Sequence, residues 1–380
     1  MPTRVDDPTP GRCEPRDCSL REAVNAANKR PGADVIKLAA RTYRLEIPQA
    51  SPDTPKVGDL DVIGPAAVKG KGARRTKVRG SGSGRVFELN IVQRIGRPDY
   101  SLSGMTVTGG LAAAQDGGAI FVGFSATRLK QLVVADNQAQ RGGGIAAAGA
   151  QLTISKTTIR NNGASSGGGF FAPAASNDTE VTISGSTISN NDGSVGGGVE
   201  LDGLNAPGAD REPTLGIANS TIAGNHAFNG GGGLAALNGA TITLDNATVA
   251  YNDASSEDGF GSGGGVEQLG TAVVDAGDSI VAGNTVGANG SGAQCFGTLQ
   301  PNSGNLFQTP ADSACSYFGT NTGDALLGPL AENGGPTKTV KLLSGSPAIG
   351  LAESCPAKDQ RGKRRPETDC DAGAVERLQP

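Results

Sequence analysis

The sequence has no tryptophan, only one histidine, and an aromatic content of 4% over its 380 residues. With so few aromatic side chains, a core has to be built from stacked aliphatic residues such as Ile, Val, Leu and Ala. The single histidine, His226, gives little scope for a metal site, and no two cysteine pairs lie close together at zinc-like spacing. The sequence therefore predicts no metal site and no cofactor.

Several other signals are missing. No run is long and apolar enough to span a membrane, and a net charge of -4 gives no overall attraction to nucleic acid. No Gly-x-Ser-x-Gly elbow surrounds a nucleophile, and no Gly-Lys-Ser/Thr follows a glycine cluster. The chain begins Met-Pro-Thr-Arg without an apolar signal region, so export would require a signal removed before this point.

The cysteines lie outside the central part of the chain. Local pairing is the simplest of the many connectivities that six cysteines allow, and disulfides at the two ends suit an oxidising compartment. The predicted pairs are Cys13 with Cys18, Cys295 with Cys315, and Cys355 with Cys370.

Glycine is abundant, with 60 residues, and it marks a repeat. A glycine cluster followed by an apolar residue recurs six times, ending at Ile120, Ile145, Phe170, Val199, Leu234 and Val266. Each cluster precedes an apolar-x-x-Asn step that ends at Asn137, Asn162, Asn191, Asn225, Asn252 or Asn284. A drifting repeat with β-branched residues around each Asn is typical of a solenoid.

Short runs in each repeat alternate apolar with small or polar residues, as in Leu152-Thr153-Ile154-Ser155 and Val181-Thr182-Ile183-Ser184. A period of two predicts strands with one buried face, and stacking of the coils buries a continuous core. Like residues then line up, so we expect the Asn residues to stack at a turn and the glycines to permit tight bends. The fold class is therefore all-β, a parallel β-helix.

Both ends differ from the repeat. Ser19-Leu20-Arg21-Glu22 is a capping box that begins an amphipathic helix, and two strand-like segments follow it up to Ile47. We expect residues 1–47 to cap the first coil, 48–305 to form the β-helix, and 306–380 to be an extended, disulfide-bearing segment that closes it.

Three stretches resemble known families of bacterial exported proteins. Residues 18–24, Cys-Ser-Leu-Arg-Glu-Ala-Val, resemble the CSLREA motif of secreted β-helix proteins. Segments 327–330, 333–337, 345–349, 359–362 and 370–376 are similar to the choice-of-anchor Q tail. The central repeats are similar to the GGAI and FxxN pairs of polymorphic outer-membrane proteins, with Ile or Val here in place of Phe.

This resemblance implies a single-stranded right-handed parallel β-helix with a pectin-lyase-like shape, secreted by a bacterium or held at its surface. It supplies no catalytic motif.

One row of residues suggests chemistry. By strand alternation, the residue after each apolar position that follows the glycines should point outward. In this row Glu200 and Glu267 lie two coils apart, or roughly 9.6 Å at the sheet spacing, which suits the two carboxylates of an inverting glycoside hydrolase. Phe121 and Phe171 in the same row would offer a stacking platform for sugars, with Asp202 beside it. The alternative is an ordinary solvated sheet face.

Basic residues cluster early in the chain, at Lys69, Lys71, Arg74, Arg75, Lys77 and Arg79. They could bind an anionic polymer or simply form a solvated loop. Because no aromatic residues are interleaved with them, nucleic acid is not expected as a partner. Lys156 and Arg160 on the repeat could provide the base of a lyase, but no acidic cluster is predicted to face them.

The leading functional prediction is a non-catalytic surface protein for adhesion or for binding an extracellular polysaccharide or a cell-surface glycan. The alternative is a polysaccharide hydrolase or lyase that uses Glu200 and Glu267. The sequence leaves the oligomeric state open.

Overall fold

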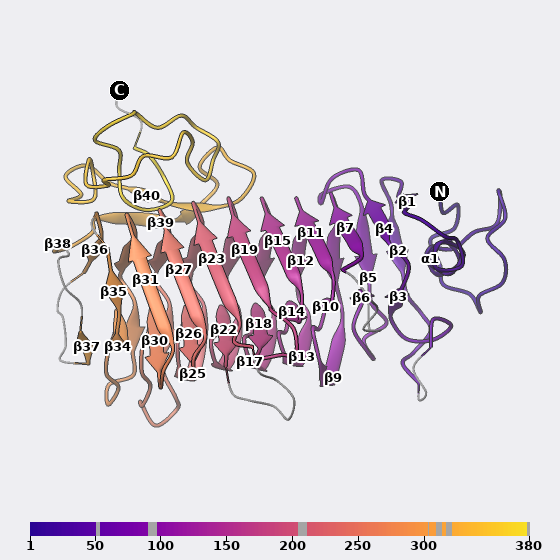
Figure 1. Cartoon of the computed structure of the whole chain (residues 1–380), viewed down its shortest axis with the longest axis horizontal. Coiled ribbons are helices and arrows are strands. Elements are labelled where there is room, and N and C mark those ends of the chain that lie inside the picture. The colour runs from indigo at the N-terminus through magenta and orange to yellow at the C-terminus, as the bar shows by residue number, and fades with distance from the viewer. Residues whose placement is uncertain are drawn as a thin grey trace.

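The computed structural model describes residues 1–50, 54–89, 97–203, 211–302, 304–308, 314–316 and 321–377. The predicted architecture is confirmed: the chain winds into an elongated right-handed parallel β-helix (Figure 1). Each central coil contributes one strand to each of four parallel sheets, which we number in the order in which the chain visits them. None of the described helices is long and apolar enough to cross a membrane.

Sheet 1 consists of β3 (Leu60–Val62), β6 (Phe87–Leu89), β10 (Ile120–Gly123), β14 (Ile145–Ala148), β18 (Phe170–Pro173), β22 (Val199–Asp202), β26 (Leu234–Leu237), β30 (Val266–Leu269), β34 (Cys295–Thr298) and β37 (Cys315–Ser316). Sheet 2 consists of β1 (Asp34–Lys37), β4 (Ala66–Lys69), β7 (Asp99–Ser103), β11 (Ala126–Lys130), β15 (Gln151–Ser155), β19 (Glu180–Ser184), β23 (Thr214–Ala218), β27 (Thr241–Asp245), β31 (Val273–Gly277) and β35 (Gln300–Pro301).

Sheet 3 consists of β2 (Thr42–Arg44), β5 (Lys77–Arg79), β8 (Thr106–Thr108), β12 (Val133–Ala135), β16 (Thr158–Arg160), β20 (Thr187–Ser189), β24 (Thr221–Ala223), β28 (Thr248–Ala250), β32 (Ile280–Ala282), β36 (Leu306–Phe307) and β38 (Asn321–Thr322). Sheet 4 consists of β9 (Leu111–Asp116), β13 (Gln138–Arg141), β17 (Gly163–Ser166), β21 (Asp192–Val195), β25 (His226–Gly230), β29 (Asp253–Ala254) and β33 (Thr285–Val286).

The core is a set of aliphatic stacks, as the alternation predicts. In sheet 3 the middle residue of each short strand points inward, and Val134, Ile159 and Ile188 pair in register with at most 1% of their surface exposed. Neighbouring strands of a sheet lie about 4.8 Å apart, so each aliphatic side chain contacts its counterpart in the next coil. Burial of these stacks drives folding of coils that could not fold singly.

The predicted asparagine ladder lies at the turn between sheets 3 and 4. The Asn162 Nδ2 donates to Asn191 Oδ1 at 2.9 Å, and Asn191 Nδ2 donates in the same way to Asn225 Oδ1 at 2.9 Å. Backbone carbonyls of the preceding coil accept a further bond from each amide, as at Ile159. The ladder therefore satisfies buried turn groups and fixes the stacking of the coils.

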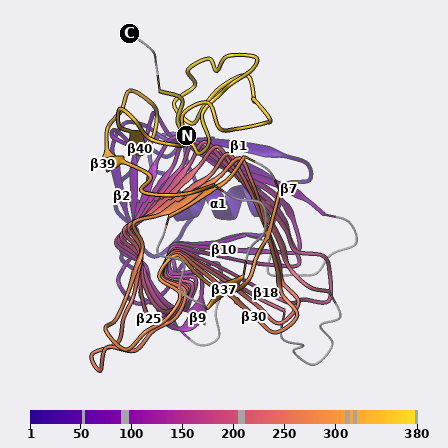
Figure 2. The ribbon, with the colours of Figure 1, turned by 90° about the vertical axis from the view of Figure 1, so that its left-hand side faces the viewer.

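The N-terminal segment covers the first coil. Helix α1 (Leu20–Asn28) begins with the predicted capping box, in which the Ser19 amide donates to Glu22 Oε2 at 2.7 Å and the Glu22 amide donates to Ser19 Oγ at 3.2 Å. Arg21 is buried in an ion pair with Asp7 at 2.8 Å. Viewed along the solenoid, α1 lies within the outline of the coils (Figure 2), so it shields the open end of the core.

The C-terminal tail does not sit on the end of the solenoid. Strands β36 and β38 continue sheet 3 past residue 305, and the chain then turns back along the outside of that sheet (Figure 1). The tail pairs β39 (Leu327–Ala331) with β40 (Thr339–Leu342) in an antiparallel ribbon. It docks where the outer face of sheet 3 becomes apolar, so that Ile280 and Leu306 form a second core with tail residues such as Leu342.

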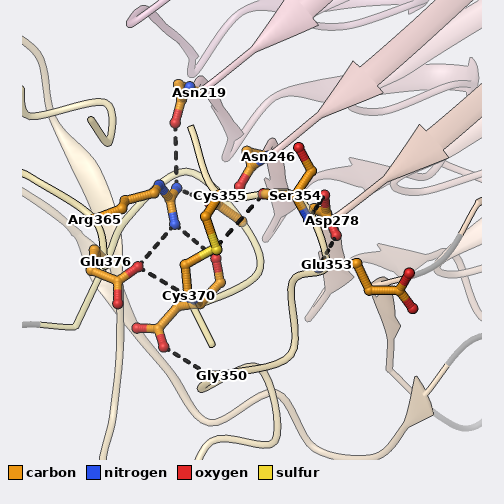
Figure 3. The surroundings of a disulfide bond; sticks show 12 residues. Asn219, Asn246, Asp278, Gly350, Glu353, Ser354, Cys355, Arg365, Cys370 and Glu376 are labelled. Carbon is orange, nitrogen blue, oxygen red and sulfur yellow. Dashed lines mark hydrogen bonds and ion pairs between the residues drawn. A yellow bond between two sulfur atoms is a disulfide. The ribbon is translucent and has the colours of Figure 1, made fainter. Parts of the chain in front are cut away.

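Buried polar contacts hold the tail in place. Gln360 lies against the threonine column of sheet 3: its amide donates to Thr187 Oγ1 at 3.0 Å, and it accepts from Thr221 Oγ1 at 2.6 Å. Asp278 accepts from the amides of Glu353 and Ser354 beside the Cys355–Cys370 disulfide (Figure 3). The tail is therefore a fixed part of the outer surface.

Candidate functional site

The predicted carboxylate row exists in the expected register. Phe171 pairs with Glu200, Glu200 with Ala235, and Ala235 with Glu267. Glu200 and Glu267 are therefore two coils apart on sheet 1. Alignment of the glycine clusters in the sequence was sufficient to place them.

The expected exposure of this row is wrong. The exposed fractions of Phe171, Glu200 and Glu267 are 2%, 3% and 4%. The cause is the glycine turn that leads into sheet 1. Gly196 has a φ of 59°, and a Cβ built on it would lie 2.6 Å from the Cβ of Glu200, so the turn backbone folds directly over the row. The same turn at Gly263 covers Glu267.

Side chains from outside sheet 1 complete the cover. The guanidinium of Arg141, in sheet 4, lies 5.0 Å from the centre of the Phe171 ring, and that of Arg85 lies 5.2 Å from the half-buried Phe121 ring. These are cation–π contacts. The two rings therefore form no open stacking platform for sugars. Asp202 accepts a hydrogen bond from Asn238 Nδ2 at 2.8 Å.

Burial changes the acidity of both glutamates. Loss of solvent, reinforced by the nearby Asp202 and Glu267 carboxylates, raises the pKa of Glu200 to about 8, although Ser166 and the Gly167 amide donate to it. Among the described residues no hydrogen-bond partner reaches Oε2 of Glu200. Burial also raises the pKa of Glu267 against a hydrogen bond from Ser262. The pair therefore consists of buried acids that the described part of the chain shields from solvent.

A second group of carboxylates lies in the first coils of sheet 1. Single oxygens of Asp59, Asp61 and Glu88 lie within 4.8 Å of one another, and all three side chains are buried. Arg85 forms an ion pair of 2.6 Å with Glu88 and lies 3.6 Å from Asp59. A guanidinium therefore already supplies positive charge to these acids.

The three predicted disulfides are present, joining Cys13 with Cys18, Cys295 with Cys315, and Cys355 with Cys370. Each holds an end segment outside the six regular repeats. They are compatible with an extracellular location.

A groove of about 1040 Å³ opens on the outer face of sheet 3. Its floor includes the outer residues of β12 and β16, such as Val133 and Thr158. One wall is the loop at residues 70–75 between β4 and β5, and the other is the tail at residues 330–338. We call this feature the sheet 3 groove.

Both walls are anchored to the coils. In the loop, the Gly72 amide donates to the Gly104 carbonyl at 2.8 Å, and Thr106 Oγ1 donates to the Ala73 carbonyl at 2.7 Å. On the tail side, Thr187 Oγ1 donates to the Lys338 carbonyl at 2.5 Å. The groove is therefore preformed.

The lining of the groove is strongly basic. Glu332 supplies the only carboxylate among the described residues that line it. The cations come from the loop, from two successive parts of one coil, and from the tail: Lys71, Arg74, Arg75, Lys156, Arg160 and Lys338. Within the described part of the chain, none of these side chains forms an ion pair, although the protein carries a net charge of -4.

The basic character continues toward the N-terminal end of sheet 3. Arg44 of β2 pairs in register with Arg79 of β5. Both are exposed, and Arg160 occupies the same strand position further along the sheet. Toward the C-terminal end the corresponding positions become Ala223, Ala250 and Ala282, where the tail docks. The outer face of sheet 3 is thus divided into a basic part and a covered apolar part.

Sequence reasoning found parts of this groove but did not join them. The sequence predicts a basic cluster at residues 69–79 that could bind anions, and it places Lys156 and Arg160 on the repeat. Because the early coils are irregular, the strands that carry the two sets cannot be aligned from the sequence. Lys338 also lies far away in the sequence. The signal that could have linked them is the shared strand position of Arg79 and Arg160.

The only histidine lies on sheet 4 between acids of the neighbouring coils. His226 Nδ1 lies 2.6 Å from Asp192 Oδ1, and Nε2 lies 3.1 Å from the Ser255 carbonyl oxygen and 3.9 Å from Asp253 Oδ2. Burial lowers the pKa of His226, but these hydrogen bonds and charges raise it more, so the net shift is upward. Both ring nitrogens face acceptors, which favours the protonated ring.

Comparisons with known proteins find similarity at the level of the fold only. No family model matches the chain, and no curated protein matches it. Among solved structures, the chain is similar to the crystal structure of pectate lyase Pel9A, with a TM-score of 0.46 and 14% sequence identity over 95% of this chain and 92% of that one.

Proposed function

We propose that the protein is exported and binds an extracellular polysaccharide in the sheet 3 groove without cleaving it. The observation that carries the proposal is the groove itself, a preformed channel about 1040 Å³ in volume between two anchored walls. The predicted alternative site is closed, because turn backbone covers Glu200 and Glu267. Three disulfides support export.

The lining supports a hydroxyl-rich ligand over a peptide. Polar groups that can exchange hydrogen bonds with sugar hydroxyls line the channel, including Gln131, Thr158 and Asn161. A peptide bound through a groove usually inserts apolar anchors into pockets, whereas few residues of this lining have large apolar side chains, and one of them, Leu132, is buried. A polymer of sugars fits an open, polar channel better.

A steric block tests the location. Thr158 lies on the floor of the groove, so Thr158→Trp would fill the channel without changing its charge. Thr153→Trp on the exposed face of sheet 2 is the matched control. Binding to a polysaccharide panel should be lost in Thr158→Trp and kept in Thr153→Trp. Equal binding by both variants would place the ligand elsewhere.

A polysaccharide hydrolase remains the second candidate because the pKa of Glu200 is raised to about 8, as suits a general acid. The covering turn would have to open for substrate to reach it. Release of new reducing ends by the protein, lost in both Glu200→Gln and Glu267→Gln, would replace the binding proposal. We expect no such release, and we expect both variants to bind the polysaccharide as the original protein does.

A further inference from the structure

We infer that the ligand of the sheet 3 groove is an anionic polysaccharide, whose carboxylate or sulfate groups are bound by the lysines and arginines of both walls and of the floor. This inference rests on the proposed function and adds the chemical class of the ligand. The sheet 3 groove lies on a different sheet from Glu200 and Glu267, and its lining is basic where that pair is acidic.

The first argument is the local charge. Six cationic side chains line the groove against one carboxylate, Glu332, in a protein with net charge -4. Like charges gathered in a cleft repel one another and raise the local potential. This repulsion destabilises the free protein slightly, and a bound anion offsets it.

The second argument is the availability of these cations. Arg74, Arg75 and Lys156 are exposed, and Arg160 is half-buried on a strand. None of the six groove cations forms an ion pair with any described residue, in contrast to Arg141, which pairs with Asp116 at 2.8 Å. An arginine fork matches a carboxylate or sulfate in two parallel hydrogen bonds.

The third argument is the regular spacing of the face. Arg44 and Arg79 are neighbours in register, and Arg160 follows at the same strand position three strands beyond Arg79. With strands about 4.8 Å apart, these arginines are presented at multiples of one spacing. A polymer that carries a charge on each repeating sugar can meet several of them at once, which adds binding without new contacts at any one site.

The lining argues against the other common polyanion. Single-stranded nucleic acids bind through basic grooves with aromatic side chains on which the bases stack. The groove residues that the structure describes include no Phe, Tyr or Trp. A polysaccharide needs hydrogen-bonding groups in place of stacking surfaces, and Thr158, Asn161 and Ser189 provide them.

The test compares polysaccharides that share one backbone. De-esterified polygalacturonate carries a carboxylate on each sugar, whereas its fully methyl-esterified form is neutral. Dextran sulfate and dextran form a second pair, and single-stranded DNA is the competing polyanion. Binding of the full chain is measured by isothermal titration calorimetry at low and at high salt.

We expect at least one acidic member to bind about tenfold or more tightly than its neutral counterpart, and added salt to weaken that binding by screening. Lys156→Gln/Arg160→Gln should weaken it by about tenfold. The matched control is Lys29→Gln/Arg30→Gln, which removes the same charges from two exposed residues at the end of α1 and should leave the binding unchanged.

Each contrary result has a distinct meaning. Equal binding of neutral and acidic members would overturn the inference on charge and leave polysaccharide binding in place. Binding of no polysaccharide would reject the proposed function as well. DNA bound as tightly as any polysaccharide, and weakened by the same groove variant, would show that the groove serves nucleic acid. Circular dichroism of both double variants confirms that the β-helix is intact.

Discussion

Glu200 and Glu267 occupy equivalent positions of β22 and β30, two coils apart, and each is covered by the first glycine of its own coil's cluster. The pairing that would suit a glycoside hydrolase is therefore enclosed in the wall of the solenoid. In this setting the charged forms of the two acids are costly, because buried carboxylates lose their hydration. Burial of the pair therefore makes the stability of the fold depend on pH.

The first prediction concerns pH. Burial raises the pKa of Glu200 to about 8, above the ordinary 4.5, so the folded state binds a proton more tightly than the unfolded state. The stability that this proton contributes is fully present below about pH 4.5 and is lost as the pH rises through about 8. The urea concentration at the unfolding midpoint should therefore decrease from acidic to alkaline buffer.

The control is Glu200→Gln, which keeps the shape of the side chain and removes its titration. As the pH rises, we expect the unfolding midpoint of the variant to increase relative to that of the original protein. An unchanged difference across the whole range would show that Glu200 does not titrate in this interval. Glu267→Gln should act in the same direction, since burial also raises the pKa of Glu267.

The second prediction uses the fact that the chain has one histidine. Nuclear magnetic resonance of the ring should give a single titration curve, with a pKa above 6.5 because Asp192 and the Ser255 carbonyl accept from the two nitrogens. Asp192→Asn should lower that pKa. A ring pKa at or below 6.5 in the original protein would contradict the geometry described for sheet 4.

The same histidine also makes stability depend on pH, but here hydrogen bonds and nearby charges raise the pKa, whereas burial raises that of Glu200. Since its folded pKa is raised, its contribution is fully present below about pH 6.5 and is lost as the pH rises through the folded value. His226→Gln should lower the unfolding midpoint in acidic buffer and change it little in alkaline buffer. The effect should be small, because the side chain is 42% exposed.

The third prediction concerns the asparagine ladder. Asn191 is 1% exposed; its side-chain amide donates to Ile159 and Asn225, and its Oδ1 accepts from Asn162. Asn191→Ala leaves buried partners unsatisfied and should lower the free energy of unfolding by about 2 kcal/mol or more. Asn190→Gly is the control at the exposed position directly before it, where a φ of 53° suits glycine. Comparable losses in both variants would argue against a special role for the ladder.

The fourth prediction separates the tail from the solenoid. Gln360 is buried and bonds to both Thr187 and Thr221 of sheet 3. Gln360→Ala should loosen the tail and speed its removal by a protease, while the far-ultraviolet spectrum of the β-helix stays the same. Lys363→Ala, at an exposed site nearby, is the control. If proteolysis of the tail is equally slow in both variants, the apolar contacts at Ile280 and Leu342 hold it without this glutamine.

Loss of the tail wall also bears on the groove. Lys338 lines the groove, and its carbonyl is held by Thr187 and by Gln360. If the tail loosens in Gln360→Ala, polysaccharide binding should weaken together with it. Loosening of the tail with full binding would show that the loop at residues 70–75 and the floor are sufficient.

The solenoid follows from patterns that can be read in the sequence alone. Alternating residues such as Leu152 and Ile154 fixed which face is buried, and the recurrence of Asn162 and Asn191 fixed the alignment of one coil on the next. These patterns are local, repeated, and set by the two-residue period of a strand. Each can therefore be recognised without knowledge of the rest of the chain. The capping box at Ser19 and the local cysteine pairs could be predicted for the same reason.

Which surfaces are open depends on long-range packing and could not be predicted from these patterns. Strand alternation places Glu200 outward, but the backbone of the glycine turn passes over it, and no pattern in the sequence states the direction of that turn. The sheet 3 groove joins the early loop at Arg75, the repeat at Arg160, and the tail at Lys338. Their proximity depends on irregular coils and on a tail that folds back along the solenoid, which are long-range packing events without a repeat to reveal them.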